Sequence, residues 1–277
     1  MMSEEEKQVK SYSEASTTSS VEIQNWIEAQ DLLKKKLIKE DDLEGNGDDL
    51  KYVGGVDISF LKEDSSVACG TLVVMDLQTL QVVYDDFSLV TVQVPYVPGF
   101  LAFRESSSVP MNAPVLLELL ERMKKRAPLL YPQLLMVDGN GILHPRGFGL
   151  ASHLGVLANL PTIGIGKNLH HVDGLTQTSV RKLLSEGKNN DSIITLKGIS
   201  GSIWGVAMRS TVDSLKPLYV SIGHRVSLDT AIEIVKITCK YRVPEPIRQV
   251  KRIPQEISNG SVRKNNFIAK SDVTYNC

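Results

Sequence analysis

Two short segments of the chain are apolar almost from end to end. They are LLMVDG at residues 134–139 and PTIGIG at residues 161–166. Continuous apolar strands are typical of the buried centre of a sheet whose two faces are both covered. We therefore expect both segments to be central strands of a sheet.

Patterns on either side predict the rest of the fold. Three β-rich runs at residues 52–60, 66–77 and 80–94 are separated by polar stretches that suit hairpins, and two more strands are expected at 202–210 and 217–223. Consecutive hairpins followed by α/β alternation predict an α/β fold with one mixed β-sheet and helices on both faces. Residues 170–192 look polar and loosely helical, and the expected helices are Val21–Glu40, Pro114–Arg126, Leu150–Asn159 and 227–240, the last with Ser227 as N-cap.

Composition narrows the class of protein. With 277 residues, 42% of them hydrophobic and 23% charged, the chain resembles a soluble globular protein with a sizeable core. Its three cysteines are far apart, which argues against a disulfide framework and a structural zinc site. We see neither an apolar run of membrane-spanning length nor a secretory signal. The expected location is therefore intracellular, in the cytoplasm or nucleus, with no membrane partner.

The charge distribution suggests three regions. Residues 1–50 carry six Lys or Arg against thirteen Asp or Glu, whereas residues 236–277 carry nine against three. We expect a disordered N-terminus at 1–20, a folded domain at 21–250 and a basic, disordered tail at 251–277. An acidic head and a basic tail are compatible with nucleic-acid binding, although many solvated chain ends have the same composition.

Three carboxylates stand in apolar or glycine-flanked segments. Asp57 lies within VGGVDISF, Asp138 ends LLMVDG, and Glu105 follows GFLAFR. A buried carboxylate is costly unless it is paired or bound to a metal, and several converging at one end of a sheet would suit Mg²⁺. The alternative is local: each aspartate caps or starts a turn, and the glutamate pairs with a neighbouring base. Their joint occurrence favours the metal-site hypothesis.

Other polar residues follow expected strands. His144 lies in the loop GNGILHPRGFG, His224 ends a strand in SIGHR, and Lys167 follows a strand in GIGK. Each is either a solvated loop residue or a contact to a phosphate or a metal-bound water. The glycine-rich loop matches neither the P-loop nor the dinucleotide fingerprint.

The segment PYVPGF contains an aromatic residue on a loop stiffened by two prolines. Tyr96 lies between them. An exposed aromatic on a rigid loop suits stacking against bases or wedging between them. Packing of the same loop on the core is the alternative.

Taken together, VGGVDISF, PYVPGFLAFRE, MVDGNGILHPRGFGLASHLG, PTIGIGK and SIGHRVSLDTA resemble the endonuclease V family in order and spacing, from about residue 22 to residue 248. The resemblance implies a ribonuclease H-like fold and cleavage of inosine-containing nucleic acid. It departs from the family in residues 106–114, which look like a short insertion, and in the basic tail.

The resemblance also implies roles for particular residues. Asp57 and Asp138 match the family's metal-binding aspartates, and Glu105 matches its catalytic glutamate, which is also expected to bind the metal. His224 matches a histidine that completes the acidic site, and Lys167 matches a lysine near the scissile phosphate. The residues implied in nucleic-acid binding are the wedge Tyr96, His144 beside the metal site, and the hypoxanthine-pocket positions Gly99, Leu101, Gly139, Leu150 and Gly164.

The activity implied is phosphodiester hydrolysis assisted by Mg²⁺, for which Mn²⁺ is expected to substitute. Cleavage is expected at the second phosphodiester bond 3′ of inosine, by a monomer that prefers single-stranded RNA. A deoxyinosine-specific DNA repair enzyme and a non-catalytic binder of deaminated nucleic acid are the alternatives. A phosphate-binding metabolic enzyme is disfavoured because the sequence lacks a cofactor fingerprint.

Overall fold

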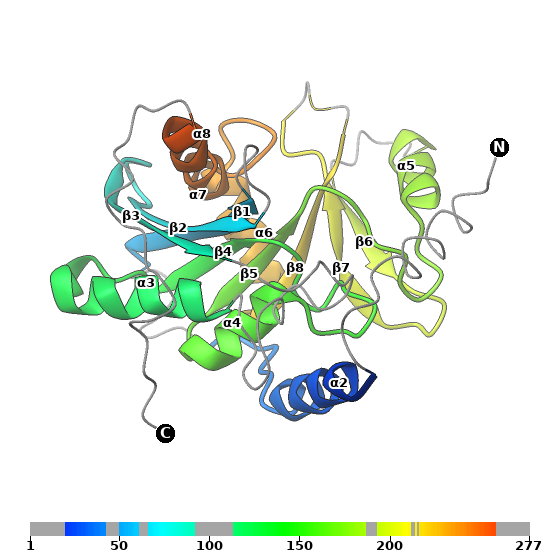
Figure 1. Cartoon of the computed structure of the whole chain (residues 1–277). Helices are drawn as coiled ribbons and strands as arrows, with labels where there is room; N and C mark the ends of the chain where they lie inside the picture. Colours follow the sequence, from blue (N-terminus) through cyan, green and yellow to red (C-terminus); the bar gives the residue numbers. More distant parts are fainter. Residues whose placement is uncertain are drawn as a thin grey trace.

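The computed structural model describes residues 20–42, 50–60, 66–91, 113–186, 193–211, 214 and 216–258. One eight-stranded sheet, in the order β3-β2-β1-β4-β5-β8-β7-β6, forms the centre of the molecule. Helices cover both of its faces (Figure 1). The predicted α/β fold with a single mixed sheet is confirmed.

The bounds of the elements agree with most of the sequence-based expectations. The strands are β1 Tyr52–Phe60, β2 Val67–Asp76, β3 Val82–Thr91, β4 Leu134–Asp138, β5 Thr162–Gly166, β6 Ile193–Lys197, β7 Ile203–Met208 and β8 Leu218–His224. The helices are α2 Ser20–Lys34, α3 Ala113–Arg126, the 3₁₀ turn η3 Pro128–Leu130, α4 Leu150–Ala158, α5 Gln177–Glu186, α6 Leu228–Thr238, α7 Glu245–Val250 and α8 Arg252–Ser258. Ser227 caps α6 as predicted, because its side chain accepts a hydrogen bond from the Thr230 backbone N–H.

The centre of the sheet is parallel and its two sides are antiparallel. Strands β1, β4 and β5 run parallel, with α3 preceding β4 and α4 connecting β4 to β5. Strands β2 and β3 extend one side as hairpins, and β8, β7 and β6 extend the other side antiparallel. Parallel neighbours need crossover connections, which the helices supply. The carboxyl ends of β1, β4 and β5 therefore meet at one edge.

Strand β4 shows how the core is divided. Leu134 and Met136 belong to a cluster that includes residues of α6 and α7, whereas Leu135 and Val137 belong to one that includes residues of α3 and α4. Side chains alternate between the two faces of a strand, so an apolar residue at every position requires cover on both faces. This is the physical reason that LLMVDG predicted a central strand.

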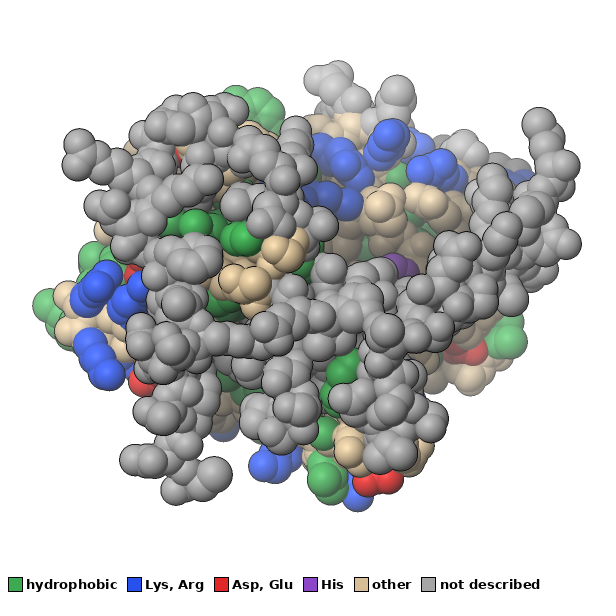
Figure 2. Space-filling model, in the orientation of Figure 1, with side chains coloured by type: hydrophobic (Ala, Val, Ile, Leu, Met, Phe, Trp, Pro, Cys, Tyr) green, Lys and Arg blue, Asp and Glu red, His purple; other side chains and the backbone are tan. Residues whose placement is uncertain are grey.

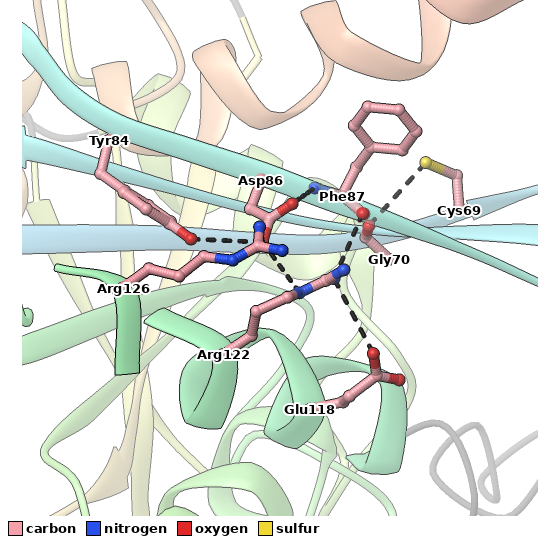
Figure 3. Close-up of polar contacts among 8 residues, drawn as sticks. All are labelled: Cys69, Gly70, Tyr84, Asp86, Phe87, Glu118, Arg122 and Arg126. Carbon is pink, nitrogen blue, oxygen red and sulfur yellow. Dashed lines mark hydrogen bonds and ion pairs between the residues drawn. The ribbon is translucent and has the colours of Figure 1, made fainter. Parts of the chain in front are cut away.

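A buried ion pair fastens α3 to the sheet (Figure 3). Arg122 Nε lies 2.9 Å from Asp86 Oδ2, and Arg122 also donates to the Phe87 carbonyl oxygen at 3.3 Å. The Tyr84 hydroxyl donates to the same aspartate at 3.2 Å. The side chains of Asp86 and Arg122 are 6% and 16% exposed. A second partner of each lies farther away, with Arg126 at 3.8 Å from Asp86 and Glu118 at 3.9 Å from Arg122, so each charge is neutralised mainly by the other.

Three sequence-based expectations about elements were wrong. Helix α2 ends at Lys34 rather than Glu40, because the Ile38 backbone pairs with His224 and Arg225 instead of continuing the helix. Strand β6 was missed inside a polar region. A disordered tail was expected from residue 251, but α8 lies at Arg252–Ser258, and Ile253 is buried. Of the ends predicted to be disordered, 1–20 and 251–277, residues 1–19 and 259–277 lie outside the described residues. No helix in the described ranges has the length and apolar character needed to cross a membrane.

The ion pair predicts a large and asymmetric effect on stability. Asp86→Ala should lower the free energy of unfolding by about 3 kcal/mol, because it leaves the Arg122 charge buried without its nearest partner. Glu121→Ala is the control, since it removes an exposed ion pair with Lys124 from the same helix and should cost less than about 1 kcal/mol. Urea denaturation of the three proteins measures both values. Equal losses in the two variants would contradict the assignment of Asp86.

Candidate active site

Parallel pairing of β1 with β4 brings two carboxylates together. Val56 is in register with Val137, so the next residues along the two strands are Asp57 and Asp138. Residues in register point to the same face, and both aspartates therefore point to the face that carries α7. Asp57 is 4% exposed, and the side chain of Asp138 is 11% exposed. The predicted convergence of these two residues at one edge of the sheet is present.

Two lysines neutralise the pair. Lys167, directly after β5, donates from Nζ to Asp138 Oδ2 at 2.8 Å. Lys251, between α7 and α8, places its Nζ 3.3 Å from Asp57 Oδ2 and in closer contact with Asp138 Oδ2. Two acidic and two basic side chains thus form one cluster, and one ammonium group bridges the two carboxylates.

The position of Lys251 depends on a glycine in β1. A Cβ atom on Gly55 would lie 2.3 Å from the Pro246 carbonyl oxygen, so only glycine lets α7 lie so close to the strand. Ile247 then packs in the cluster beneath α6 and α7, while Val250 and Ile253 join a cluster against β2 and β3. These contacts hold the junction of α7 and α8, and with it Lys251, above the carboxylates.

The cluster perturbs the ionisation of its members. Burial raises the pKa of Asp57 above its ordinary value, and the charge of Asp138 adds to the rise, while Lys251 opposes it. Burial alone would lower the pKa of Lys251, but the charges of Asp57 and Asp138 raise it instead. Burial lowers the pKa of Lys167, and Asp138 opposes that effect. Perturbed groups gathered in this way are typical of functional sites.

The carboxylate pair fits a divalent cation by its chemistry. Oδ2 of Asp57 and Oδ2 of Asp138 both face the same positive group, the ammonium of Lys251. One or two carboxylates, together with phosphate oxygens of a substrate, are the usual ligands of Mg²⁺. Among the described residues no third acidic or histidine side chain joins the pair. The third predicted ligand, Glu105, lies outside the described residues.

His224 is not brought to this cluster. Strand β8 runs antiparallel to β5, so His224 pairs with Thr162 at the start of β5, whereas Asp138 pairs with Ile165 near its end. The His224 Nδ1 atom accepts a hydrogen bond from the Ile38 backbone N–H at 3.2 Å. Burial lowers its pKa. The expectation that His224 completes the acidic site is corrected, because the direction of β8 places His224 beside the start of β5, at the opposite end of the strands from Asp138.

Three of the expected pocket residues lie together beside Asp138. A Cβ atom on Gly164 would lie 2.2 Å from the Gly141 backbone nitrogen and 2.9 Å from the Gly139 oxygen, so the loop rests directly on β5. Leu150 closes the same corner, since a Cβ atom on Gly139 would meet its side chain at 3.5 Å. The other residues expected to contact nucleic acid, Tyr96, Gly99 and Leu101, lie outside the described residues.

His144 lies in the same loop and is partly buried. Its Nδ1 accepts a hydrogen bond from the Arg146 backbone N–H at 3.2 Å. Burial, with smaller contributions from His170 and Arg146, lowers the pKa of His144 to about 4. The side chain is therefore neutral at pH 7, and it supports the loop as a hydrogen-bond acceptor.

Two clefts adjoin the cluster and share Lys167. One, of about 250 Å³, is lined by Lys167, Val243, Ile247, Arg248, Lys251, Arg252 and Gln255. The other, of about 210 Å³, is lined by Lys167, Asn168, Gln177, Arg181, Lys216, Pro217, Tyr219 and Arg242. All charged residues in the described walls of both clefts are basic. Figure 2 shows lysine and arginine side chains gathered in the upper part of the face that it draws. Such clefts attract a phosphate backbone.

Lys251 is the member of the cluster that sequence reasoning missed. The chain from residue 251 onward is polar and basic in composition, which favoured a disordered tail. A weaker signal was present, because Ile247, Val250 and Ile253 recur every three residues, as on one side of a helix. That spacing predicts a buried stripe.

Comparisons with known proteins identify one family. The profile of the family described as Endonuclease V matches residues 31–252. Endonuclease V of Mus musculus is 46% identical over 232 residues, covering 81% of this chain and 66% of the mouse protein, just under two thirds of its length. Endonuclease V of Homo sapiens is 47% identical over 205 residues, covering 72% of this chain and 69% of the human protein.

Solved structures agree in fold. The catalytic domain of human Endonuclease V is 40% identical, with a TM-score of 0.81 over 88% of this chain and 98% of that one. Ciona intestinalis Endonuclease V, in complex with a 24mer DNA containing an inosine followed by a ribo-adenosine, is 32% identical. Its TM-score is 0.80, over 88% of this chain and 100% of that one. The expected ribonuclease H-like fold is thereby confirmed.

Burial of His144 predicts a loss of stability in acid. The unfolded chain binds a proton near pH 6.5, whereas folded His144 stays neutral down to about pH 4. This contribution to stability is therefore complete above pH 6.5 and falls as the pH drops, by about 2 kcal/mol at pH 5. Urea unfolding at pH 7.5 and pH 5 measures the fall. His144→Gln should reduce it, and the exposed control His171→Gln should leave it unchanged. The same pH dependence in all three proteins would contradict this role.

Proposed function

Because the chain belongs to the endonuclease V family, we propose that it is a divalent-metal-dependent endonuclease that cleaves inosine-containing nucleic acid. The observation that carries the proposal is the pairing of Asp57 and Asp138 with Lys251 and Lys167, two lysines that also line basic clefts. Carboxylates that hold a cation beside surfaces that bind phosphate are what phosphodiester hydrolysis requires.

The residues of the site have different proposed roles in the reaction. Asp57 and Asp138 would hold the metal, with Glu105 as the proposed third ligand. A divalent ion held there supplies activation of a water molecule and neutralisation of the leaving 3′ oxygen. Lys167 donates from Nζ to Asp138 Oδ2 at 2.8 Å. At this position its ammonium group would also donate a hydrogen bond to a phosphate that lies beside the two carboxylates. The basic clefts position the strand without reading its sequence.

Selectivity for inosine is proposed to come from the corner formed by Gly139, Gly164 and Leu150. A flipped base stacks on small and apolar groups and hydrogen-bonds to exposed backbone, so a tight wall made of two glycines and one leucine favours one base edge over another. Gly99 and Leu101 are the proposed remaining walls, and Tyr96 the proposed wedge that fills the vacated stack.

The finer proposal is that single-stranded RNA is preferred and that the cut falls at the second phosphodiester bond 3′ of inosine. One observation on a relative supports it: the 24mer DNA in complex with the Ciona intestinalis protein contains an inosine followed by a ribo-adenosine. A deoxyinosine-specific DNA repair activity remains the alternative substrate assignment.

A second candidate, a non-catalytic binder of deaminated nucleic acid, is favoured by one feature. The Lys251 ammonium bridges Asp57 and Asp138. A protein that only binds nucleic acid would gain from this, because a neutralised acidic pair no longer repels phosphates. The two candidates differ in whether strands are cut.

The deciding experiment compares cleavage of matched 5′-labelled single strands. One pair carries inosine or adenosine in RNA, and the other carries deoxyinosine or deoxyadenosine in DNA. We expect cleavage of the inosine strands in Mg²⁺ or Mn²⁺, faster for RNA, with product lengths that map the cut to the second bond. Binding of inosine strands without any cut would support the binder, and equal cleavage of adenosine strands would contradict both candidates.

Substitution of the carboxylates tests their role. Asp57→Asn and Asp138→Asn should each reduce cleavage at least about a hundredfold, because each removes a charged oxygen ligand. Binding of the same strands should persist or tighten, since repulsion of the phosphates falls. The exposed Asp85→Asn on β3 is the control and should leave both quantities unchanged. Activity within about tenfold of the wild type would remove these residues from the metal site.

A further inference from the structure

The bridging position between the two carboxylates is occupied by a side chain of the protein itself. Lys251 Nζ contacts Oδ2 of Asp57 at 3.3 Å and Oδ2 of Asp138 more closely. Both carboxylates thus share one cation, and they are the side chains that would hold a divalent ion. Lys167 contacts Asp138 Oδ2 as well, so two positive charges already balance the two negative ones.

We propose that Lys251 is a tethered cation that fills the divalent-ion position between Asp57 and Asp138, so that a metal ion binds only when the ammonium group withdraws. The inference rests on the proposed function, because it concerns the metal of that same site. It assigns Lys251 a regulatory role in metal binding rather than a role as a metal ligand, since an ammonium group has no lone pair to offer.

The surroundings give Lys251 room to withdraw. Its side chain is 37% exposed and lines the cleft of about 250 Å³, so the ammonium can swing toward solvent without unpacking the core. Neighbouring Arg248 and Arg252 are paired with Glu245 and Glu256, which lowers the repulsion that Lys251 meets on that side. The anchoring apolar residues Val250 and Ile253 stay buried during such a movement.

Exchange of the Lys251 ammonium group for a metal ion lowers the measured affinity for the metal. The metal must displace an ammonium group that is paired with two poorly hydrated carboxylates, so its affinity is lowered by the strength of those contacts. Lys251→Met keeps the length and apolar stem of the side chain but removes the charge. Without metal, this variant leaves Asp57 and Asp138 with one cation instead of two. It should therefore be less stable than the wild type and bind metal more tightly.

The test is Mn²⁺ binding to the full-length protein, measured by the free-ion electron paramagnetic resonance signal, with the melting temperature recorded with and without Mn²⁺. Lys251→Met should bind Mn²⁺ at least about tenfold more tightly than the wild type and gain more melting temperature from it. Lys251→Gln, which keeps a polar end group, should behave in the same direction and replaces the methionine variant if that one does not fold. Lys236→Met, at an exposed position on α6, is the charge-matched control and should bind as the wild type does.

The outcomes separate this proposal from the proposed function. Equal Mn²⁺ affinity in the wild type and both Lys251 variants overturns the exchange, even if the wild type cleaves inosine strands. Tighter binding in the variants, abolished again by adding Asp57→Asn, supports it, even if no protein cuts any strand. Loss of stability without a gain in affinity would also overturn it, because a purely structural lysine behaves in that way.

Discussion

The whole site depends on the parallel pairing of β1 with β4. This register, Val56 opposite Val137, sets Asp57 beside Asp138 at the same edge and on the same face of the sheet. Two carboxylates in such a place repel each other, and burial strips them of water, so the fold is stable only if cations are supplied. Lys167 comes from the end of the neighbouring strand β5, and Lys251 from the junction above the face. The fold therefore places two lysine ammonium groups beside the pair of carboxylates.

Packing of α7 and α8 against the sheet holds one of these lysines, Lys251, in place. Gly55 in β1 lets the backbone of Pro246 approach, and the apolar residues of α7 and α8 hold the junction in place. A segment with the composition of a solvated tail thus becomes a wall of the site. A Cβ atom on Gly55 would push α7 away and move Lys251 off the carboxylates. The glycine within VGGVDISF consequently serves the site as well as the strand.

Most strands of the sheet could be predicted from the sequence, whereas the lysine contacts that neutralise Asp57 and Asp138 could be predicted only in part. Alternating or continuous apolar runs report burial directly, which is why β1 to β5, β7 and β8 were predicted. Asp57 and Asp138 stood out because a charge in an apolar strand is costly. Lys251 did not, because a lysine among polar residues gives no local signal and its partners lie 194 and 113 residues away along the chain. His224 was misplaced for a similar reason, since strand direction is a tertiary property and no residue in SIGHR encodes it.

Displacement of Lys251 would couple metal binding to nucleic-acid binding. With the ammonium group paired to the carboxylates, its charge is neutralised inside the cluster. The cleft beside it is then lined by Lys167, Arg248 and Arg252, each of which has an acidic partner of its own. A metal ion that takes the carboxylate position returns that ammonium to the cleft and adds two positive charges to the site. Each effect favours a phosphate nearby, and by reciprocity a bound phosphate favours the metal. The lysine that lowers metal affinity in the free protein thereby makes the site more selective for metal and substrate together.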